Sequence, residues 1–426
     1  MANCFVSADI LLPSAETPLD PWACIAVDQF TSQPEYWQQA EARAAGRPST
    51  LHLVLPEAYL GTAQQEGRLA EIRAAMGEYR DTVLTRTVHG YVYVERTQQD
   101  GTVRQGLVGA VDLEAYSYEP GAKLPIRPSE KTVVERIPPR LEVRRGASLE
   151  TPHVMMLADD EEETLIEPIA QQKDRLPLLY DGELMLGGGR LCGWAVEDPA
   201  LIAQIDRALA RLGERERFAA RWPQAADQPT MTLAVGDGNH SLATAKAYWE
   251  ELKPTLPPET REEHPARWCL AEVCNVHSPA IEMEAIHRVI FGATAAQFTE
   301  AFARWTAAQG IEREGEAAQR FTLCDAQGEQ TLTVANASDP LAVGTLEHFL
   351  AEAAPAEWTV DYIHGADTAR ALAADPAHPA VAVLLPEFAK ADLFKGVVLG
   401  GVLPRKTFSM GHAEEKRYYN ECRSLL

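Results

Sequence analysis

The segment TMTLAVGDGNHSLATAKAYWEEL, residues Thr230–Leu252, joins an apolar run, a short polar loop and a helical pattern. The apolar run predicts a buried strand, and Leu242, Ala245, Trp249 and Leu252 recur at the spacing of one helix face. Alternating strands and helices are typical of folds that pack helices on a sheet. We therefore expect an α+β protein of mixed α/β character.

Patterns elsewhere in the chain agree with this fold class. Residues 64–80 have the apolar spacing of an amphipathic helix. Turn signals at Asp100-Gly101 and at Gly187-Gly188-Gly189 predict two hairpins. Residues 120–153, rich in proline and charge, predict a long ordered loop or a functional segment. The acidic run at residues 159–163 is interpreted as an exposed turn.

The length of 426 residues predicts two or three domains. The strand and helix pattern restarts after residue 291, with a new helix and a new hairpin. We place the domain boundary there. Residues 1–291 are then the candidate catalytic region. Residues 292–426 form a second α/β region whose final segment is expected to return to the site.

The charge balance narrows the function classes. Lys and Arg number 39 against 62 Asp and Glu, a formal net charge of −23. Proteins whose main task is binding nucleic acid neutralise phosphates with basic residues, so this class is disfavoured, as is docking on anionic membranes. No apolar run is long enough to span a bilayer. The seven scattered cysteines are typical of reduced thiols. We expect a cytoplasmic protein with a small-molecule partner, and the oligomeric state stays open.

The loop of the opening segment holds the densest group of reactive side chains. Gly236 and Gly238 permit a tight turn and close approach of a ligand. Asp237 could hold a metal ion or accept a proton, Asn239 could bind a hydroxyl or an amide, and His240 could donate to phosphate. The following helix would add its positive N-terminal end. The plainer alternative is that Asp237 or Asn239 caps the helix and His240 packs.

A second candidate is the basic segment IRPSEKTVVERIPPRLEVRR, which begins at Ile126. Its arginines could bind phosphate or carboxylate in bidentate fashion, although a surface Arg–Glu network would explain the same residues. The basic residues are Arg127, Lys131, Arg136, Arg140, Arg144 and Arg145, against Glu130, Glu135 and Glu142.

Two further candidates lie near the chain ends. Asp28 follows the apolar run CIAV, where a carboxylate at a strand end is either catalytic or caps a turn. Near the C-terminus, hydroxyl, lysine and histidine side chains gather more densely than a tail requires, and they could contact a ligand. These residues are Lys406, Thr407, Ser409 and His412, with Arg405, Lys416 and Arg417 adding positive charge.

Long blocks of this sequence resemble one family. In chain order they read ADILLP, AVDQFTSQPEYW, GLVGAVDLEAY, IRPSEKTVVERIPPR, VGDGNHSLATAKAYWE, HPARWCLAEVCNVH, EAIHRVIF and LPRKTFSMGHAEEKRYY. Their order over nearly the whole chain resembles the bacterial and archaeal family labelled domain of unknown function 1015. That resemblance predicts a common fold and leaves the activity open.

Many members of that family carry D-G-H-H-R where this chain has residues 237–241. That motif is similar to one of the ParB/sulfiredoxin-like fold, which includes free serine kinases. This resemblance implies nucleotide or phosphate handling around Asp237, with Mg²⁺ and an adenine nucleotide as cofactors. Ser241 stands where the motif has Arg, so an arginine of residues 127–140 would have to supply the phosphate contact.

The leading hypothesis is therefore small-molecule phosphoryl transfer on serine or phosphoserine, in the kinase or the dephosphorylating direction, with a small anionic metabolite as partner. The alternatives are a non-catalytic nucleotide or metabolite sensor and, more remotely, a ParB-like DNA-binding module. The expected catalytic residues are Asp237, His240, Asp28 and Asn239, with Asp237 also the candidate Mg²⁺ ligand. The expected phosphate- or nucleotide-binding residues are Arg127, Glu130, Arg136, Arg140, Gly236, Gly238, Ser241, Lys406, Ser409 and His412.

Overall fold

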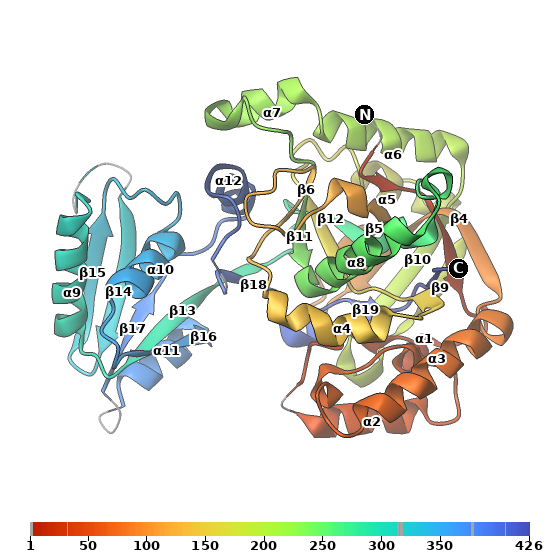
Figure 1. Ribbon diagram of the computed structural model, residues 1–426, viewed down its shortest axis with the longest axis horizontal. Coiled ribbons are helices and arrows are strands. Elements are labelled where there is room, and N and C mark those ends of the chain that lie inside the picture. Colours follow the sequence, from red (N-terminus) through yellow and green to blue (C-terminus); the bar gives the residue numbers. More distant parts are fainter. Residues whose placement is uncertain (1–2, 32, 313–314, 316–317, 376–378, 405) are drawn as a thin grey trace. The chain divides into compact units, whose positions relative to one another are not determined.

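The computed structural model describes residues 3–31, 33–312, 315, 318–375, 379–404 and 406–426. The chain divides into two compact units (Figure 1). Unit 1 comprises Met1–Ile281 and His412–Leu426, and unit 2 comprises Glu282–Gly411. Unit 2 is therefore an insertion between two stretches of unit 1. The expected boundary at residue 291 falls at the end of a strand that pairs within unit 2, so this unit begins earlier than we expected.

A mixed sheet forms the centre of unit 1. In the described residues its main path runs β6-β11-β8-β12-β5-β4-β10-β9, with β1 paired to β5 and β2 paired to β4. Both parallel and antiparallel pairs occur, because β11 runs parallel to β6 and antiparallel to β8. The strands are β1 (Phe5–Val6), β2 (Ala8–Leu12), β4 (Arg86–Thr97), β5 (Val103–Asp112), β6 (Ile126–Pro128), β8 (Met155–Ala158), β9 (Leu178–Glu183), β10 (Arg190–Val196), β11 (Leu233–Asp237) and β12 (Trp268–Asn275).

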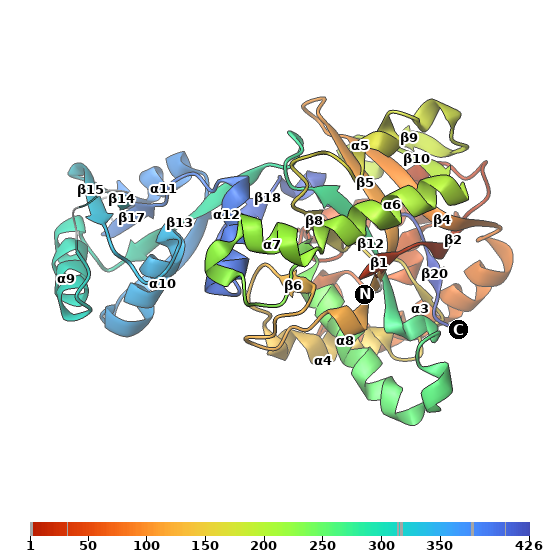
Figure 2. The ribbon, with the colours of Figure 1, turned by 90° about the horizontal axis from the view of Figure 1, so that it is seen from above.

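Both faces of this sheet are buried, as β4 shows. Its residues Val92 and Val94 belong to one apolar core, whereas Tyr91 and Tyr93 belong to the core on the opposite face. This alternation is the period of two that a strand imposes on its side chains. Helices α1 to α3 contribute to the first core, and α5, α6 and α8 to the second. Of these helices, α3, α5, α6 and α8 can be seen in Figure 2. The second core includes Trp249 of α8, so the helix of the decisive segment is anchored on the sheet.

The helices of unit 1 are short to medium in length. Helices α4 and α8 lie side by side (Figure 1). Helix α4 lies inside the proline-rich segment that we expected to be a loop; its prolines stand in the first helical turn, where a missing N–H costs nothing. The helices are α1 (Leu19–Trp22), α2 (Pro34–Ala44), α3 (Gln65–Thr82), α4 (Ile137–Arg144), α5 (Glu167–Ala170), α6 (Pro199–Leu212), α7 (Arg215–Arg221) and α8 (Asn239–Leu252).

Unit 2 is a smaller α/β body. Its described strands follow the order β15-β14-β17-β13-β16, with β18 paired to β13. The strands are β13 (Met283–Phe291), β14 (Gln319–Asp325), β15 (Gly328–Val334), β16 (Thr359–His364), β17 (Ala380–Leu384) and β18 (Phe408–Met410). The helices are α9 (Ala295–Ala308), α10 (Ala342–Ala353), α11 (Ala366–Ala373) and α12 (Lys390–Lys395).

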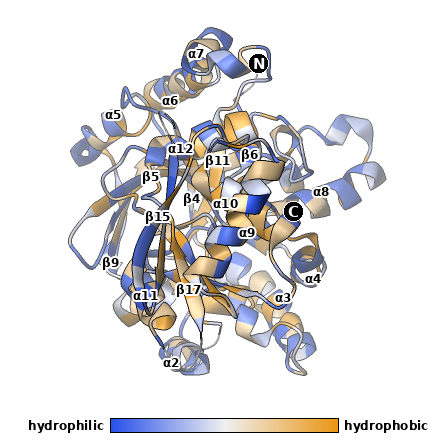
Figure 3. Ribbon diagram, turned by 90° about the vertical axis from the view of Figure 1, so that its left-hand side faces the viewer, coloured by the Kyte–Doolittle hydropathy of each residue, from blue (hydrophilic) through white to orange (hydrophobic). Residues whose placement is uncertain are grey.

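The expected fold class is confirmed, since sheets and helices mix in both units. The amphipathic helix predicted over residues 64–80 is α3, and its apolar residues Leu69, Ile72, Met76 and Tyr79 are buried. Both predicted hairpins form, as β4–β5 and β9–β10. Figure 3 shows the hydrophobic residues gathered in strands such as β11 and β17, with hydrophilic residues on α2 and α7.

The acidic run at residues 159–163 is only partly an exposed turn. Asp159 and Asp160 are buried. The carboxylate of Asp160 accepts hydrogen bonds from the backbone N–H groups of Thr164 and Leu165, at 2.7 and 2.8 Å, and so shapes the turn. Charge in a sequence does not reveal such internal partners, and for this reason the expectation of full exposure was wrong for these two residues.

The last residues of unit 1, which we call the C-terminal strap (Lys416–Leu426), run through its interior. Strand β19 (Tyr418–Tyr419) pairs with β3 (Cys24–Ile25), and β20 (Arg423–Ser424) pairs with β7 (Leu149–Glu150). Two buried charge networks hold the strap. Arg417 donates to Glu272 and Glu421 at 2.8 and 2.6 Å. Arg423 donates to Glu150 at 2.8 Å, and that carboxylate also accepts from Arg144 at 2.7 Å.

These networks make acid stability testable. Burial raises the pKa of Glu272, but Arg104 and Arg417 outweigh it and hold this pKa below its ordinary value. A carboxyl group with a lowered folded-state pKa stabilises the fold above its unfolded pKa of about 4.3 and loses that contribution as the pH falls through the folded value. We expect the free energy of unfolding, measured by urea denaturation, to fall below about pH 4. In Glu272→Gln the decline should be shallower; an identical decline in both proteins would contradict the assignment.

Two simpler expectations also hold in the structure. All seven cysteines are free, and Cys192 alone among them is not buried. Within the described residues, no helix combines the length and the apolarity that crossing a bilayer requires.

Candidate functional site

The loop between β11 and α8 forms as the sequence predicts. Strand β11 ends at Asp237, and Gly238 turns the chain into α8 with a φ of 78°. A Cβ at Gly238 would lie 3.0 Å from the Cα of Val154, so the conformation and the contact both require glycine. The N-terminus of α8 has no side-chain cap. The alternative of capping by Asp237 or Asn239 therefore does not apply, and the first N–H groups of the helix have no intrahelical acceptor.

Two buried oxygens of this loop lack hydrogen-bond donors. Within the part of the chain that the structure describes, neither Asp237 Oδ2 nor Asn239 Oδ1 has a hydrogen-bond partner. Asp237 Oδ2 instead lies 3.4 Å from the Nζ of Lys416, while Asn239 Nδ2 lies 3.5 Å from the Oγ of Ser129. A buried acceptor without a donor costs about 1–3 kcal/mol, so such atoms are expected to meet a ligand. Carboxylate and amide oxygens are also common ligands of Mg²⁺, so these two side chains fit the expected cation.

Asp28 lies beside an imidazole. Its Oδ1 is 3.9 Å from the Nε2 of His153, a side chain that is buried, and Asp28 itself keeps 33% of its side-chain surface exposed. Burial raises the pKa of Asp28, but His153, a hydrogen bond from Gln29 and the charge of Lys416 outweigh it. The pKa of Asp28 is therefore lower than usual, and the group is an ionised carboxylate at neutral pH.

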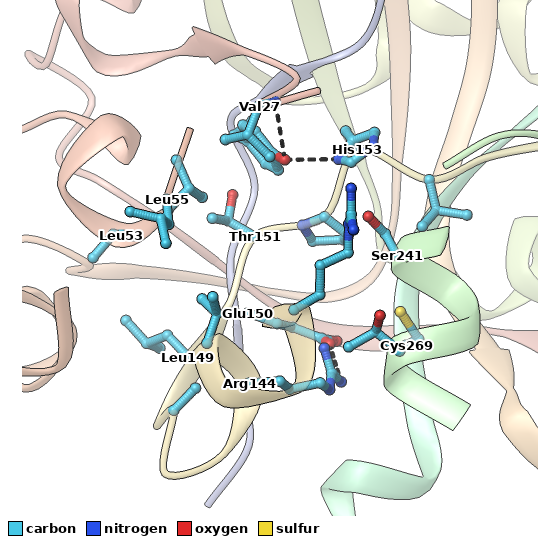
Figure 4. A pocket seen from close by; sticks show the side chains of 18 of the residues that line it. Val27, Leu53, Leu55, Arg144, Leu149, Glu150, Thr151, His153, Ser241 and Cys269 are labelled. Atoms are coloured by element: carbon cyan, nitrogen blue, oxygen red, sulfur yellow. Dashed lines mark hydrogen bonds and ion pairs between the residues drawn. The ribbon is translucent and has the colours of Figure 1, made fainter. Parts of the chain in front are cut away.

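Tyr419 of the C-terminal strap fixes this imidazole. The backbone N–H of Val27 donates to the Tyr419 hydroxyl at 3.4 Å, and that hydroxyl lies 2.7 Å from the Nδ1 of His153 (Figure 4). Burial raises the pKa of Tyr419 well above its usual value. The Tyr419 hydroxyl therefore bridges the Val27 N–H and the Nδ1 of His153, and it holds the imidazole with its Nε2 toward Asp28.

Lys416 connects the two acidic residues. It forms an ion pair with Asp237, and its charge lowers the pKa of Asp28. A Cβ at Gly238 would lie 3.5 Å from the Cδ2 of His153, so the loop that holds Asp237 adjoins the imidazole, and residues from four distant parts of the chain lie close together. We call this group the polar cluster; it consists of Asp28, His153, Asp237, Asn239, Lys416 and Tyr419.

The basic segment adjoins this cluster through backbone and hydroxyl groups. The backbone N–H of Val133 donates to the Nε2 of His240 at 3.3 Å, and Ser129 lies beside Asn239. Strand β6 also pairs with β11. The basic segment therefore lies next to the loop. Its backbone and Ser129 make the contacts, and its arginines do not.

The arginines of the segment have other partners. Arg127 is buried and donates to the carbonyl oxygens of Leu124 and Pro229, so it holds a loop. Arg136 is exposed. Arg140 forms an ion pair with Glu57. The partners of Glu130 are not described, and its binding role stays a prediction.

The C-terminal candidates separate between the units. Lys406 and Ser409 belong to unit 2, and the Ser409 hydroxyl donates to the carbonyl oxygen of Gly411 at 3.3 Å. His412 belongs to unit 1 and is exposed. Arg405 lies outside the described residues. The binding roles of Lys406, Ser409 and His412 therefore stay predictions.

A second acidic and histidine cluster lies elsewhere in unit 1. The ligand atoms of Asp159, Glu161 and His277 lie within 4.8 Å of one another. Arg221 forms ion pairs with both carboxylates, at 2.5 and 2.8 Å. A guanidinium group already balances their charge, so this cluster is a structural ion-pair network.

A cavity of about 150 Å³ opens beside the polar cluster (Figure 4). His153, Tyr419 and Ser241 line it on the side of the cluster. Its other walls are mainly apolar, and they are formed by Leu53, Val54, Leu55, Leu60, Met76, Val143, Ala147 and Leu149. Two ion pairs, Arg140–Glu57 and Arg144–Glu150, also border it.

Sequence reasoning missed His153 and Tyr419 and counted Lys416 only as surface charge. His153 stands just before the buried strand β8, and Asp28 stands just after the buried strand β3. The rule that singled out Asp28, a polar residue at the end of a buried strand, could therefore have singled out His153 as well. No sequence signal identified Tyr419, because the pairing of the C-terminal strap with β3 joins residues almost four hundred positions apart.

The role of Tyr419 can be tested by Tyr419→Phe. The change leaves the Val27 N–H and the His153 Nδ1 without their partner, so we expect the free energy of unfolding to fall by about 1–3 kcal/mol. Urea denaturation measures this loss, and NMR of the His153 ring nitrogens should show a mixture of tautomers. Tyr59→Phe is the matched control, because that half-buried hydroxyl bonds to Glu41 outside the cluster. An equal loss in both variants would contradict a special role for Tyr419.

Comparison with known proteins gives low similarities to solved structures. A free serine kinase in complex with AMP is 11% identical, with 73% of this chain and 90% of that chain covered and a TM-score of 0.36. A conserved hypothetical protein from Pyrococcus furiosus is 11% identical, with coverages of 74% and 94% and a TM-score of 0.34. SbnI with a C-terminal truncation, from Staphylococcus aureus, is 10% identical, with coverages of 74% and 85% and a TM-score of 0.36. TM-scores this low do not establish a shared fold, so the ParB/sulfiredoxin-like assignment stays a prediction.

Sequence comparison is more specific. No match is found among curated protein sequences. The family model described as protein of unknown function (DUF1015) matches residues 9–356, which confirms the resemblance predicted from the sequence blocks. The chain belongs to the DUF1015 family of proteins of unknown function.

Proposed function

We propose that unit 1 is an enzyme of small-molecule phosphoryl transfer, with serine or phosphoserine as its substrate and the polar cluster as its catalytic site. One observation carries the proposal: Asp237, ion-paired with Lys416, stands before Gly238, which lies against His153, and that imidazole lies beside Asp28 and near the uncapped N-terminus of α8. Phosphoryl transfer is catalysed mainly by positioning and charge neutralisation, and this arrangement offers both.

The anion-binding part of the proposal rests on Lys416 and α8. The first N–H groups of α8 have no intrahelical acceptor and carry the positive end of the helix dipole, so they suit phosphoryl oxygens. Lys416 adds a full positive charge at the same place. These groups take over the role that an arginine plays in the resembling motif, where this chain has Ser241.

The proton-transfer part rests on Asp28. In the kinase direction the serine hydroxyl oxygen attacks the terminal phosphorus of a nucleotide, the bond from that phosphorus to the leaving phosphate oxygen breaks, and Asp28 takes the hydroxyl proton. In the opposite direction water attacks phosphoserine, the bond from phosphorus to the serine oxygen breaks, and Asp28 passes the proton of the water to that oxygen. His153 orients the Asp28 carboxylate in both directions.

Asp237 and Asn239 are the residues that would hold Mg²⁺, through Asn239 Oδ1, which accepts no hydrogen bond within the described residues, and Asp237 Oδ2, which the cation would share with or take over from Lys416. Bound there, the cation would neutralise charge on the phosphoryl oxygens. The DNA-binding alternative has no support in the site, since the chain has a net charge of −23 and the arginines that border the cavity, Arg140 and Arg144, form ion pairs with Glu57 and Glu150.

The test is a substrate panel followed by phosphorus NMR, with the full chain and Mg²⁺. Serine is offered with ATP or ADP, and phosphoserine is offered alone, with AMP or with ADP. Turnover in one combination, lost in Asp28→Asn and kept in Asp9→Asn, supports the proposal; Asp9 has an exposed carboxylate outside the cluster. No turnover in any combination overturns the enzymatic proposal, and nucleotide binding without turnover would identify a sensor instead.

A further inference from the structure

We infer that the substrate of this site carries an uncharged apolar group about the size of a benzene ring, and that this group occupies the cavity beside the polar cluster. The inference rests on the proposed function, because it places the reacting oxygen at that cluster. It narrows the proposed substrate class from serine or phosphoserine itself to derivatives of them that carry such a group, since serine alone would leave the cavity empty.

The walls of the cavity are permanent parts of the fold. Leu53, Leu55, Met76 and Leu149 are each less than a tenth exposed and belong to the apolar core of unit 1. They come from separate elements, which fix the space between them. An apolar cavity of about 150 Å³ in another protein is large enough for benzene and stays dry when empty. A ligand group of that size would bury part of its apolar surface against these walls.

The cavity and the polar cluster share residues. His153 and Tyr419 belong to both, and Val27 lines the cavity directly before Asp28. Ser241 lines it from the first turn of α8. A molecule that places an oxygen between Asp28 and the end of α8 therefore has the cavity as the nearest space for its remaining atoms (Figure 4).

The charged groups around the cavity are already paired. Arg140 and Glu57 neutralise each other, and Glu150 is held by Arg144 and Arg423. Each carboxylate at the cavity thus has a guanidinium partner, and the Arg144–Glu150–Arg423 group carries one positive charge in excess. A buried charge without a partner is strongly unfavourable, so the part of the ligand that contacts the apolar walls must be neutral.

The inference is tested by binding, so that it does not depend on turnover. Dissociation constants of phenyl phosphate and methyl phosphate are measured by calorimetry on the full chain. These probes share the phosphoryl group and differ in the ring. We expect phenyl phosphate to bind at least about tenfold more tightly, because the ring leaves water. Equal affinities, or no binding of either probe, would overturn the inference.

Val143→Phe provides the matching variant. Val143 lines the cavity and is half-buried, so a larger side chain can fill the space with little strain. We expect the preference for phenyl phosphate to disappear while the affinity for methyl phosphate stays the same. Val103→Phe is the control, since Val103 is 41% exposed and lies outside the cavity. Thermal melting of each variant confirms that it is folded, and Ala147→Val repeats the test at a second wall.

The outcomes separate this inference from the proposed function. A preference for phenyl phosphate that Val143→Phe removes, without turnover of any substrate, supports the cavity as a ligand site and rejects the enzymatic proposal. Turnover of serine with equal affinities for phenyl phosphate and methyl phosphate supports the enzymatic proposal and rejects the cavity as a ligand site. If Val143→Phe weakens AMP binding and leaves phenyl phosphate binding unchanged, a nucleobase occupies the cavity and the inference is wrong.

Discussion

Asp237→Asn is expected to lower kcat for the panel reaction that turns over by at least about a hundredfold, and by up to about a thousandfold. The substitution preserves shape but removes the negative charge beside Lys416 and weakens the site for a cation. The amide oxygen of asparagine can still accept from Lys416, so the folded state should lose only part of the contribution of that ion pair. Initial rates by phosphorus NMR and melting by calorimetry measure the two effects.

Asp9→Asn serves as the control for that result, because it removes one negative charge from an exposed position. A rate within about tenfold of the native protein for Asp237→Asn would reject Asp237 as a member of the catalytic site. A large drop in melting temperature would instead mean that the carboxylate supports the fold. Native-like melting with a lost rate is the expected pattern.

The largest loss of stability is expected from Arg417→Met. Arg417 is buried and is the ion-pair partner of both Glu272 and Glu421. Its removal leaves buried carboxylates with less compensation, which typically costs about 3–5 kcal/mol. Urea denaturation measures the loss. Because Lys416 precedes Arg417 in the chain, we also expect activity to fall at temperatures where the variant is still folded.

Arg190→Met is the matched control for this stability test. Arg190 pairs with Asp181 at 2.8 Å, but its side chain is 49% exposed, and such surface pairs contribute only about 0–1 kcal/mol. A loss for Arg417→Met as small as that for Arg190→Met would show that the strap is not held by its buried charges.

Local structure was predictable wherever the pattern of apolar residues sufficed. The strand, loop and helix from residue 230 to 252, the helix α3 and the two hairpins follow from periodicity and turn chemistry. The helix α4 did not, because Pro138 and Pro139 disfavour a helix interior yet are acceptable in its first turn.

The candidate site was predictable only in part. Asp28, Asp237 and Asn239 stood out because polar residues followed predicted strands, and the structure brings them to one cluster. Arg127 was predicted to bind phosphate, but its guanidinium group donates to the carbonyl oxygens of Leu124 and Pro229. Sequence counts charges but does not show their partners, and it gives no signal that residues 28, 153, 237 and 416 converge.

The insertion of unit 2 has a consequence for biosynthesis. Lys416 and Tyr419 follow the whole of unit 2 in the chain, yet they complete the cluster in unit 1. Most of unit 1 can therefore fold while unit 2 is still being translated, but it does so with the groove for β19 and β20 vacant. A product whose synthesis stops within unit 2 would be compact and inactive, and it would expose unpaired strand edges to chaperones and proteases.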